Sequence, residues 1–393
     1  MKKFLHILKR TGGYFLKFLI AFLVIANLYI LITGNFYIYR AVYYTFLHGQ
    51  MGPGIFDKDY FHSREVEIAN AQPWPLSKKY NKYKLTEEQR NSLTSLSTTS
   101  FLVFKNDSLL YEEYFDGYGE KERSNSFSIA KSVVGLLIGV AQAEGKINSI
   151  DDPVSKYLSG YSEGTRKKIT IRHLLTMSSD MVWNESAWNP LSDNAEAYYG
   201  TDLNTKMESV EYGKNPGKVF DYKSGSQQVL AMILQKVTGK TLAAYASEKI
   251  WKKVGAENSA YWSLDAKNGV EKSYCCLYAT SRDFARLGKL MMNNGEWNGE
   301  QVIDSTYAAQ SVIPADLTTT EGDKNDRYGY CWWITSHQNK KVFYARGIKG
   351  QYIVCIPSEN IIIVRTGHKR GDKRADDQPK DLFAMIDMAL SFK

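Results

Sequence analysis

The sequence lacks internal repeats and low-complexity tracts, so its 393 residues are expected to fold as one large domain or two medium ones. Cysteine is scarce: the four residues stand at positions 275, 276, 331 and 355, and none has the C-x-x-C spacing of a metal site. The adjacent residues Cys275 and Cys276 are not expected to bridge easily, and all four cysteines are expected to be small buried side chains. The cysteine pattern therefore predicts neither a metal centre nor a disulfide framework.

The chain also lacks the pattern of a nucleic-acid-binding surface, although its formal net charge is +8. Lysines and arginines at positions 2, 3, 9, 10 and 17 lie ahead of or inside an apolar N-terminal segment. A second basic cluster, "HKRGDKR", occupies residues 368–374. Neither cluster alternates with aromatic residues, so no nucleic-acid partner is predicted, and the excess charge is interpreted as membrane orientation plus a solvated loop.

A long uncharged run is present near the N-terminus. Residues 18–32, "FLIAFLVIANLYILI", carry no charge, and with residues 14–17 they approach the about 20 residues that span a bilayer. Because positive residues precede the run, we expect a cytoplasmic tail (1–13), a transmembrane anchor (14–33) and an exported remainder, periplasmic or at the cell surface. A signal peptide cleaved near Val24-Ile25-Ala26 is the alternative, but the apolar run continues past that site, which favours an uncleaved anchor.

The rest of the chain is predicted to form a stalk followed by one domain. Residues 34–85 have no sustained hydrophobic period and are expected to be a stalk or linker that packs onto a domain spanning 86–393. In that domain "SFLVFKNDSLLYEEYF" (100–115) predicts a hairpin, and three β-type runs lie near 341–347, 351–357 and 361–367. Helical patterns lie between them, among them 170–177, 227–239 and a helix running from a Ser281 cap to Gly295, and a last helix closes the chain at 379–390. This order predicts an α+β fold: one sheet built from both ends of the domain, with a helical subdomain inserted at about 146–300.

The stretch "SFSIAKSVVG" (126–135) opens the most apolar helix predicted in the domain. Ser128 and Lys131 stand three residues apart, so they share one face of that helix. Ser128 lies at the helix start, where free N–H groups favour developing negative charge. A lysine in apolar surroundings loses proton affinity and can act as a base toward a serine hydroxyl. The alternative is a capping serine beside a surface lysine, but an unpaired lysine in so apolar a helix would be costly, which favours chemistry.

Two further elements are weaker when taken alone. Tyr222-Lys223-Ser224 precedes a predicted helix, where a tyrosine can relay a proton to a leaving group, but Tyr157-Leu158-Ser159 matches the same short pattern. Gly347 and Gly350 at a strand entry let the backbone approach a ligand closely. A strand N–H group can then pair with that of Ser128 as an oxyanion hole, and a glycine-rich strand entry without function is the alternative.

Other polar and aromatic candidates are interpreted as structural. His173 sits inside an apolar helix, and Asp151-Asp152-Pro153 is typical of a turn rather than a metal site. Four tryptophans are candidates for a pocket wall, although aromatic side chains are core residues by default: Trp183, Trp188, Trp332 and Trp333.

Together, and in this order, these elements resemble the serine β-lactamase-like hydrolases, most of all the class C branch with its esterases and 6-aminohexanoate-dimer hydrolases. The resemblance covers about residues 99–392 and rests on blocks such as "SFSIAKS", "TIRHLLTMSS", "YATSRDFARLGKLM", "YGYCWWI" and "ARGIKGQYIVCIP". It implies a β-lactamase/transpeptidase-like fold with an antiparallel sheet flanked by helices, and catalysis without metal or cofactor. It implies that Ser128 is the nucleophile, Lys131 the base and Tyr222 the proton relay. It also implies an oxyanion hole made by the N–H groups of Ser128 and of Ile348, which lies beside Gly347, and a substrate-binding position at Ser224.

Two departures from the penicillin-recognising members narrow the expected function. Ser224 stands where those members carry Asn, and Ala345-Arg346-Gly347 stands where they carry Lys-Thr-Gly or His-x-Gly. The lysine that usually binds a substrate carboxylate is thus missing. Arg346 could take its place, or Arg365-Thr366-Gly367 could be a displaced form of the motif. The stretch "GIKGQ", which follows Arg346 and matches the family, favours Arg346. We therefore expect a membrane-anchored, extracytoplasmic serine hydrolase that cleaves a small-molecule ester or amide. A D,D-peptidase or β-lactamase, and a catalytically inactive ligand-binding module, are the alternatives.

Overall fold

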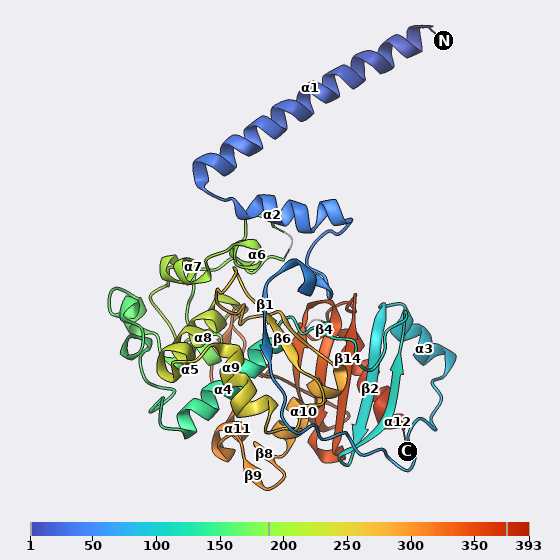
Figure 1. The fold of residues 1–393 in the computed structure, drawn as a ribbon, viewed down its shortest axis with the longest axis vertical. Coiled ribbons are helices and arrows are strands. Elements are labelled where there is room, and N and C mark those ends of the chain that lie inside the picture. The colour runs from blue at the N-terminus through green and yellow to red at the C-terminus, as the bar shows by residue number, and fades with distance from the viewer. Residues whose placement is uncertain (1, 188, 375, 393) are drawn as a thin grey trace.

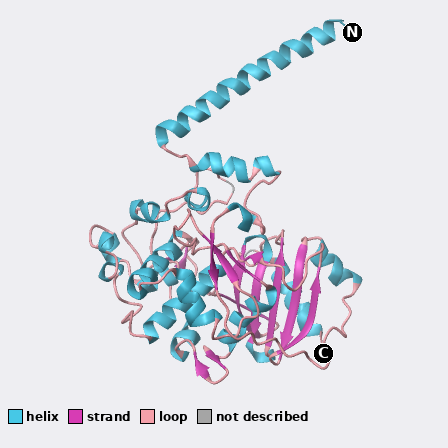
Figure 2. Ribbon diagram, viewed as in Figure 1, coloured by secondary structure: helices cyan, strands magenta, loops and turns pink. Residues whose placement is uncertain are grey.

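A six-stranded antiparallel sheet forms the centre of the domain in the computed structural model, which describes residues 2–187, 189–374 and 376–392 (Figures 1 and 2). Its strands, in spatial order, are β11 (Trp333–His337), β12 (Lys340–Gly347), β13 (Gln351–Ile356), β14 (Ile361–Gly367), β2 (Thr98–Lys105) and β3 (Ser108–Tyr114). Strand β14, close to the C-terminus, pairs with β2 from the N-terminal part of the domain. The α+β prediction, with one sheet built from both ends of the domain, is confirmed.

The predicted hairpin is formed by β2 and β3. Its turn residues Asn106 and Asp107 both have positive φ angles, 49° and 58°. Asn and Asp tolerate this left-handed region, and a turn of this kind matches the twist of the flanking strands.

Alternate residues of the sheet face two different cores. Leu102, Ile353 and Val364 pack with α4 (Ile129–Ala143) and α10 (Ser281–Met292). Their strand neighbours pack instead with the closing helix α12 (Lys380–Ser391) on the other face. Helix α10 lies so close that a Cβ on Gly288 would come within 3.0 Å of Ile353 and Ile362. Figure 1 shows α10 against the sheet, so this helix covers the sheet rather than belonging to the helical layer predicted up to residue 300.

The other helices of the helical layer lie beside the sheet, and several of them contact the buried helix α4 (Figure 1). They are α5 (Ile171–Leu175), α6 (Asp193–Tyr199), α7 (Leu203–Ser209), α8 (Gly225–Thr238), α9 (Leu242–Ala246) and α11 (Ser305–Ser311). Thr170 caps α5 as predicted, because its side chain accepts a hydrogen bond from the N–H group of His173. The predicted Ser281 cap of α10 is wrong: the preceding residue, Thr280, accepts the capping bond from Asp283.

A second antiparallel sheet leads the chain into the site. It consists of β1 (Ser63–Val66), β6 (Ala260–Ser263), β7 (Leu277–Ala279) and β4 (Ser124–Asn125), in that order. Smaller two-stranded pairs join β10 (Thr318–Thr319) to β5 (Val219–Phe220) and β8 (Glu296–Trp297) to β9 (Glu300–Gln301). Strand β4 ends three residues before Ser128, so this sheet fixes where α4 begins.

The N-terminal region divides into a projecting helix and a segment that packs on the domain (Figure 1). Helix α1 (Lys2–Thr33) points away from the domain. Its part Thr11–Thr33 is the one helix among the described residues that is long and apolar enough to cross a membrane. The segment 34–85, expected to be a stalk, contains α2 (Tyr37–Tyr44) and β1, and a further helix, α3 (Glu87–Thr94), follows it. Strand β1 pairs with β6, so this segment contributes a strand to the domain.

The expectation that the adjacent cysteines stay unbridged is wrong. Cys275 and Cys276 form a disulfide bond. Cys276 has a φ of 67°, in the left-handed region that few non-glycine residues adopt. Cys331 and Cys355 are buried free thiols, as expected.

Candidate active site

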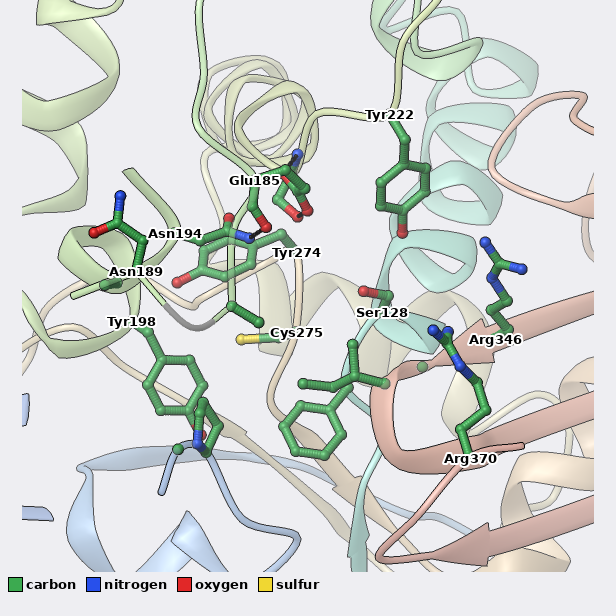
Figure 3. Close-up of a pocket in the computed structure, with 18 of the residues that line it drawn as sticks. Ser128, Glu185, Asn189, Asn194, Tyr198, Tyr222, Tyr274, Cys275, Arg346 and Arg370 are labelled. Carbon is green, nitrogen blue, oxygen red and sulfur yellow. Dashed lines mark hydrogen bonds between the residues drawn. The ribbon is translucent and has the colours of Figure 1, made fainter. Parts of the chain in front are cut away.

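A cavity of about 740 Å³ lies against the N-terminal end of α4, and Ser128 is part of its wall (Figure 3). A cavity of this volume is in the range that small-molecule sites occupy, about 300–1,000 Å³. Of the residues predicted from the sequence, Ser128, Tyr222, Ser224, Gly347 and Ile348 all line it. Three separate parts of the chain therefore meet at one place: the start of α4, the segment before α8, and the end of β12 with the loop that follows it.

Ser128 is the N-cap residue of α4, and its side chain forms no capping bond, so the hydroxyl is available to other partners. The preceding residue, Phe127, has a φ of 43°, which is an uncommon conformation for a bulky residue and is costly. The surrounding structure enforces it: the N–H group of Phe127 donates to Asn125 Oδ1 at 2.9 Å, and that of Ser126 donates to the carbonyl of Leu277. The sharp turn presents the Ser128 hydroxyl at the positive end of the helix.

Lys131 lies one turn into α4, with only 1% of its surface exposed. Its Nζ donates to Ser128 Oγ at 2.8 Å and to the backbone carbonyl of Tyr274 at 3.0 Å. No carboxylate of the described residues lies within ion-pair distance of Nζ. A buried amine that is joined to a hydroxyl without a neutralising acid has the arrangement of a base paired with a nucleophile. Tyr274 was not singled out from the sequence; its carbonyl fixes the direction of the lysine side chain.

Tyr222 lies just before α8, with its hydroxyl directed toward Ser128 (Figure 3). The centre of its ring is 5.0 Å from Lys131 Nζ, within the range of a cation–π contact. The ring packs against Trp333 and Tyr328, with centroid separations of 5.5 Å and 5.9 Å. These contacts hold the Tyr222 ring beside the serine–lysine pair.

Ser224 is held by a residue that sequence reasoning missed. Its N–H group donates to Glu185 Oε2 at 2.7 Å, and its hydroxyl donates to Glu185 Oε1. The carboxylate thus sits at the N-terminal end of α8, where the helix dipole favours negative charge. Glu185 also lines the cavity, but no local pattern in its loop signals the pairing, since the two residues are far apart in the sequence.

The end of β12 approaches the segment 126–128 very closely. A Cβ on Gly347 would lie 2.4 Å from the carbonyl oxygen of Ser126 and 3.0 Å from Phe127 Cβ. Glycine is required there for space, because the φ of Gly347 is an ordinary −112°. This contact sets the next residue, Ile348, at the cavity beside Ser128.

The two candidate replacements for the missing lysine occupy different environments. Arg346 lines the cavity, donates to Asp377 Oδ2 at 3.0 Å, and lies 3.6 Å from the centre of the Trp333 ring. Burial alone would raise the pKa of Asp377, but the hydrogen bond from Lys373 and the charge of Arg346 together lower it, so Asp377 stays ionised. Arg346 is therefore already paired.

Arg365 faces away from the cavity. It is buried and donates to the backbone carbonyls of Leu96, Lys349, Gly350 and Lys369 and to Thr98 Oγ1. Burial lowers its pKa to about 10. Its donors organise the loops at the end of the sheet, so the segment 365–367 is not a displaced substrate box.

Arg370 is a cavity residue that the sequence analysis placed only in a solvated loop. It lines the cavity on the same side of Ser128 as Arg346 in Figure 3. It forms no ion pair or hydrogen bond with the other described residues. A guanidinium that is free of a partner is suited to bind a carboxylate or another anion of a ligand.

The other candidates lie outside the site or in the core. His173 completes the cap of α5, since its Nδ1 accepts the N–H group of Thr170. Asp151 forms a two-pronged ion pair with Arg172. Trp333 lines the cavity, Trp183 and Trp332 belong to the hydrophobic core, and Trp188 lies outside the described residues. Within the described part of the chain, no three His, Cys, Asp or Glu side chains converge to hold a metal ion.

Comparison with known proteins gives one family. The family model described as "Beta-lactamase" matches residues 86–384. The 6-aminohexanoate-dimer hydrolase of Paenarthrobacter ureafaciens is 26% identical over 71% of this chain and 74% of its own. A teichoic acid D-alanine hydrolase of Staphylococcus aureus strain MRSA252 is 28% identical over 63% of this chain and 59% of its own. A solved structure from Bacillus anthracis, provisionally named a 6-aminohexanoate-dimer hydrolase, superposes with a TM-score of 0.71, at 25% identity over 86% of this chain and 90% of its own.

Proposed function

The chain belongs to the beta-lactamase family of serine hydrolases, and we propose that it is a membrane-anchored, extracytoplasmic enzyme that cleaves a small ester or amide through an acyl-enzyme on Ser128. The observation that carries the proposal is the buried 2.8 Å hydrogen bond between Lys131 Nζ and Ser128 Oγ at the cavity. A serine hydroxyl is a weak nucleophile by itself, and a base in direct contact with it supplies the missing activation.

The reaction follows from the positions of these groups. Lys131 Nζ takes the hydroxyl proton as Ser128 Oγ forms a bond to the substrate carbonyl carbon. The oxygen of that carbonyl becomes an oxyanion, which accepts hydrogen bonds from the backbone N–H groups of Ser128 and Ile348. Tyr222 delivers a proton to the leaving alcohol or amine as its bond to carbon breaks, and the Tyr222 oxygen takes back the proton that Lys131 received from Ser128. Water then gives a proton to Lys131 as its oxygen bonds to the acyl carbon. The bond from that carbon to Ser128 Oγ breaks, Oγ takes the proton from Lys131, and the acid product leaves.

The choice of ester or amide over β-lactam is supported by the two departures from the penicillin-recognising pattern. Asn at this position would offer a side-chain amide to the substrate. Ser224 has no amide, and its hydroxyl is already hydrogen-bonded to Glu185. Arg346 is paired with Asp377, so it does not replace the missing lysine as a free cation. The names of two relatives, a hydrolase of the 6-aminohexanoate dimer and one of teichoic acid D-alanine, give the same reaction class.

The membrane location is supported by α1. Its segment Thr11–Thr33 is 23 residues long, and almost none of its most apolar window packs against the domain. Four basic residues at positions 2, 3, 9 and 10 precede it, which favours a cytoplasmic N-terminus. Protease added to spheroplasts, from which any outer membrane has been removed, is expected to remove the domain and to leave the α1 segment in the membrane fraction. Full protection of the domain would contradict the extracytoplasmic assignment.

The chemistry is tested by intact-mass labelling of the full chain in phospholipid nanodiscs with an ethyl fluorophosphonate. Wild type is expected to take one adduct, as the Ser128 Oγ–P bond forms and fluoride leaves, and Ser128→Ala is expected to take none. Lys131→Met removes the base at nearly constant volume, so labelling should slow by about 10²–10⁴-fold while the thermal midpoint is retained. A folded wild-type chain that stays unlabelled would contradict the proposal and favour a ligand-binding module.

A further inference from the structure

One wall of the cavity comes from outside the domain matched by the family. Residues between 38 and 53, on and just after α2, line it together with the catalytic candidates. Those that carry the argument are apolar: Ile38, Val42, Phe46, Met51 and Pro53. Other segments of the lining carry the polar groups Ser128, Tyr222 and Arg370. The cavity lining therefore combines reactive polar groups of the domain with apolar side chains of the membrane-proximal segment.

The apolar wall is fixed to the domain. Tyr37 and Ala41, one helical turn apart, are buried, and α2 packs on α6. At its end the ring of Tyr44 stacks on Tyr60 with a centroid separation of 5.2 Å. Arg40 donates to the carbonyl of Gly200. The segment thus keeps its place beside the cavity and does not act as a loose tether.

The rim of this wall remains open to solvent. Phe46 is 61% exposed and Met51 is 75% exposed, although both line the cavity. Large apolar side chains exposed together at the mouth of a site are typical of a surface that meets a lipid or another apolar partner. The catalytic pair does not need them, since Ser128 and Lys131 are held by other elements.

The rim also lies close to the proposed membrane surface. Three residues, 34–36, separate the last residue of α1 from the first residue of α2. They reach at most about 10 Å, and the eight residues of α2 add about 12 Å. The mouth of the cavity is thus at most on the order of 20 Å from the end of the anchor, on the membrane-proximal part of the protein.

We propose that this apolar wall binds the aliphatic chain of an amphiphilic substrate, so that the ester or amide group of the same molecule reaches Ser128 in the same cavity. The inference rests on the proposed serine chemistry and names the substrate class of that site. Each methylene that leaves water for an apolar surface favours binding by about fourfold, so chain length should increase reactivity.

The test compares ethyl, octyl and hexadecyl fluorophosphonates on the full chain in nanodiscs, with the second-order rate of Ser128 labelling as the readout. Wild type should react at least about tenfold faster with the octyl probe than with the ethyl probe. Phe46→Ser and Met51→Ser should each lower this ratio at least threefold and leave the ethyl rate within twofold of wild type. The matched control is Leu47→Ser, since Leu47 is 71% exposed beside Phe46 but does not line the cavity.

Each outcome bears on a different statement. An octyl-to-ethyl ratio near one, or a ratio that Leu47→Ser lowers as much as Phe46→Ser does, would overturn the chain-binding wall while the serine chemistry stands. No labelling by either short probe would overturn the proposed function and this inference with it. Rapid labelling by the hexadecyl probe, which stays in the bilayer, would identify the source as membrane lipid. Octyl labelling without hexadecyl labelling would identify a soluble amphiphile, and both results support the wall.

Discussion

Replacing Gly347 with alanine tests whether the close contact between the end of β12 and the residues just before Ser128 controls the rate of acylation. The added Cβ would lie 2.4 Å from the carbonyl oxygen of Ser126 and 3.0 Å from Phe127 Cβ. Non-bonded carbon and oxygen atoms stay about 3.3 Å apart, so the two segments must separate by about 1 Å. The nearest atom is backbone, which cannot turn aside as a flexible side chain would. The separation therefore moves the Ile348 N–H group away from the substrate oxyanion that is proposed to form when Ser128 attacks the carbonyl carbon.

The expected effect is large on the rate and moderate on stability. A displacement of about 1 Å in the reacting geometry costs on the order of 10²-fold in rate. Overpacking at a buried contact costs about 1–3 kcal/mol in the free energy of unfolding. In a domain of this size the Tm falls by about 2–4 °C for each kcal/mol. Gly347→Ala should therefore remain folded and label slowly.

The assay is the rate of ethyl fluorophosphonate labelling by intact mass, with Tm measured on the same sample. Gly160→Ala is the control, because a Cβ on Gly160 would have no neighbour within 4 Å. The control should label at the wild-type rate. If Gly347→Ala labels within threefold of wild type, the strand end does not position the oxyanion donor and the reasoning is refuted.

Three further results are expected. Tyr222→Phe keeps the ring contact with Trp333 but removes the hydroxyl. Ester turnover should therefore fall by about 10²–10⁴-fold with an unchanged Tm. Turnover above a tenth of wild type would contradict the role of Tyr222 as a proton relay. Arg370→Gln should raise KM at least about tenfold for an ester that carries a carboxylate and leave a neutral ester unaffected; equal effects on both would contradict an anion-binding role. Burial lowers the pKa of His173 below its usual 6.5, so the folded state binds its proton less readily than the unfolded chain does. The stability that neutral His173 contributes is present above pH 6.5 and is lost as the pH falls toward the lowered pKa. The Tm of wild type should therefore drop more between pH 7.5 and 5.5 than the Tm of His173→Asn. Equal drops would contradict a contribution of His173 to the pH dependence.

Sequence patterns with a short range predicted the fold well. The hairpin at β2 and β3, the buried helix α4 and the strands β12 to β14 each follow from a local pattern of apolar residues and turns. The ends of helices were less accurate, since Thr280 rather than Ser281 caps α10. Either residue is a good cap, and the choice depends on which N–H group the folded helix leaves unpaired.

The candidate site was predictable where one element carries the chemistry. Ser128 and Lys131 stand one turn apart on a single helix, so their contact is a local property. Glu185, Tyr274 and Arg370 gave no such signal, because each reaches the site from a loop that only the packing of other elements brings there. The disulfide between the adjacent cysteines was missed for a similar reason: it depends on the backbone conformation at Cys276.

By itself, the sequence determined the α+β order of elements, the apolar N-terminal helix and the serine–lysine pair, since helical and strand periods and one-turn spacing are properties of neighbouring residues. Only the tertiary structure decided that Arg346 is paired with Asp377 and that Arg370 is free to meet a ligand. It also decided that residues 38–53, which carry no sustained period, become a wall of the cavity. Such roles depend on contacts between segments far apart in the chain, and the free energy that fixes them comes from burial of surfaces that meet only after folding.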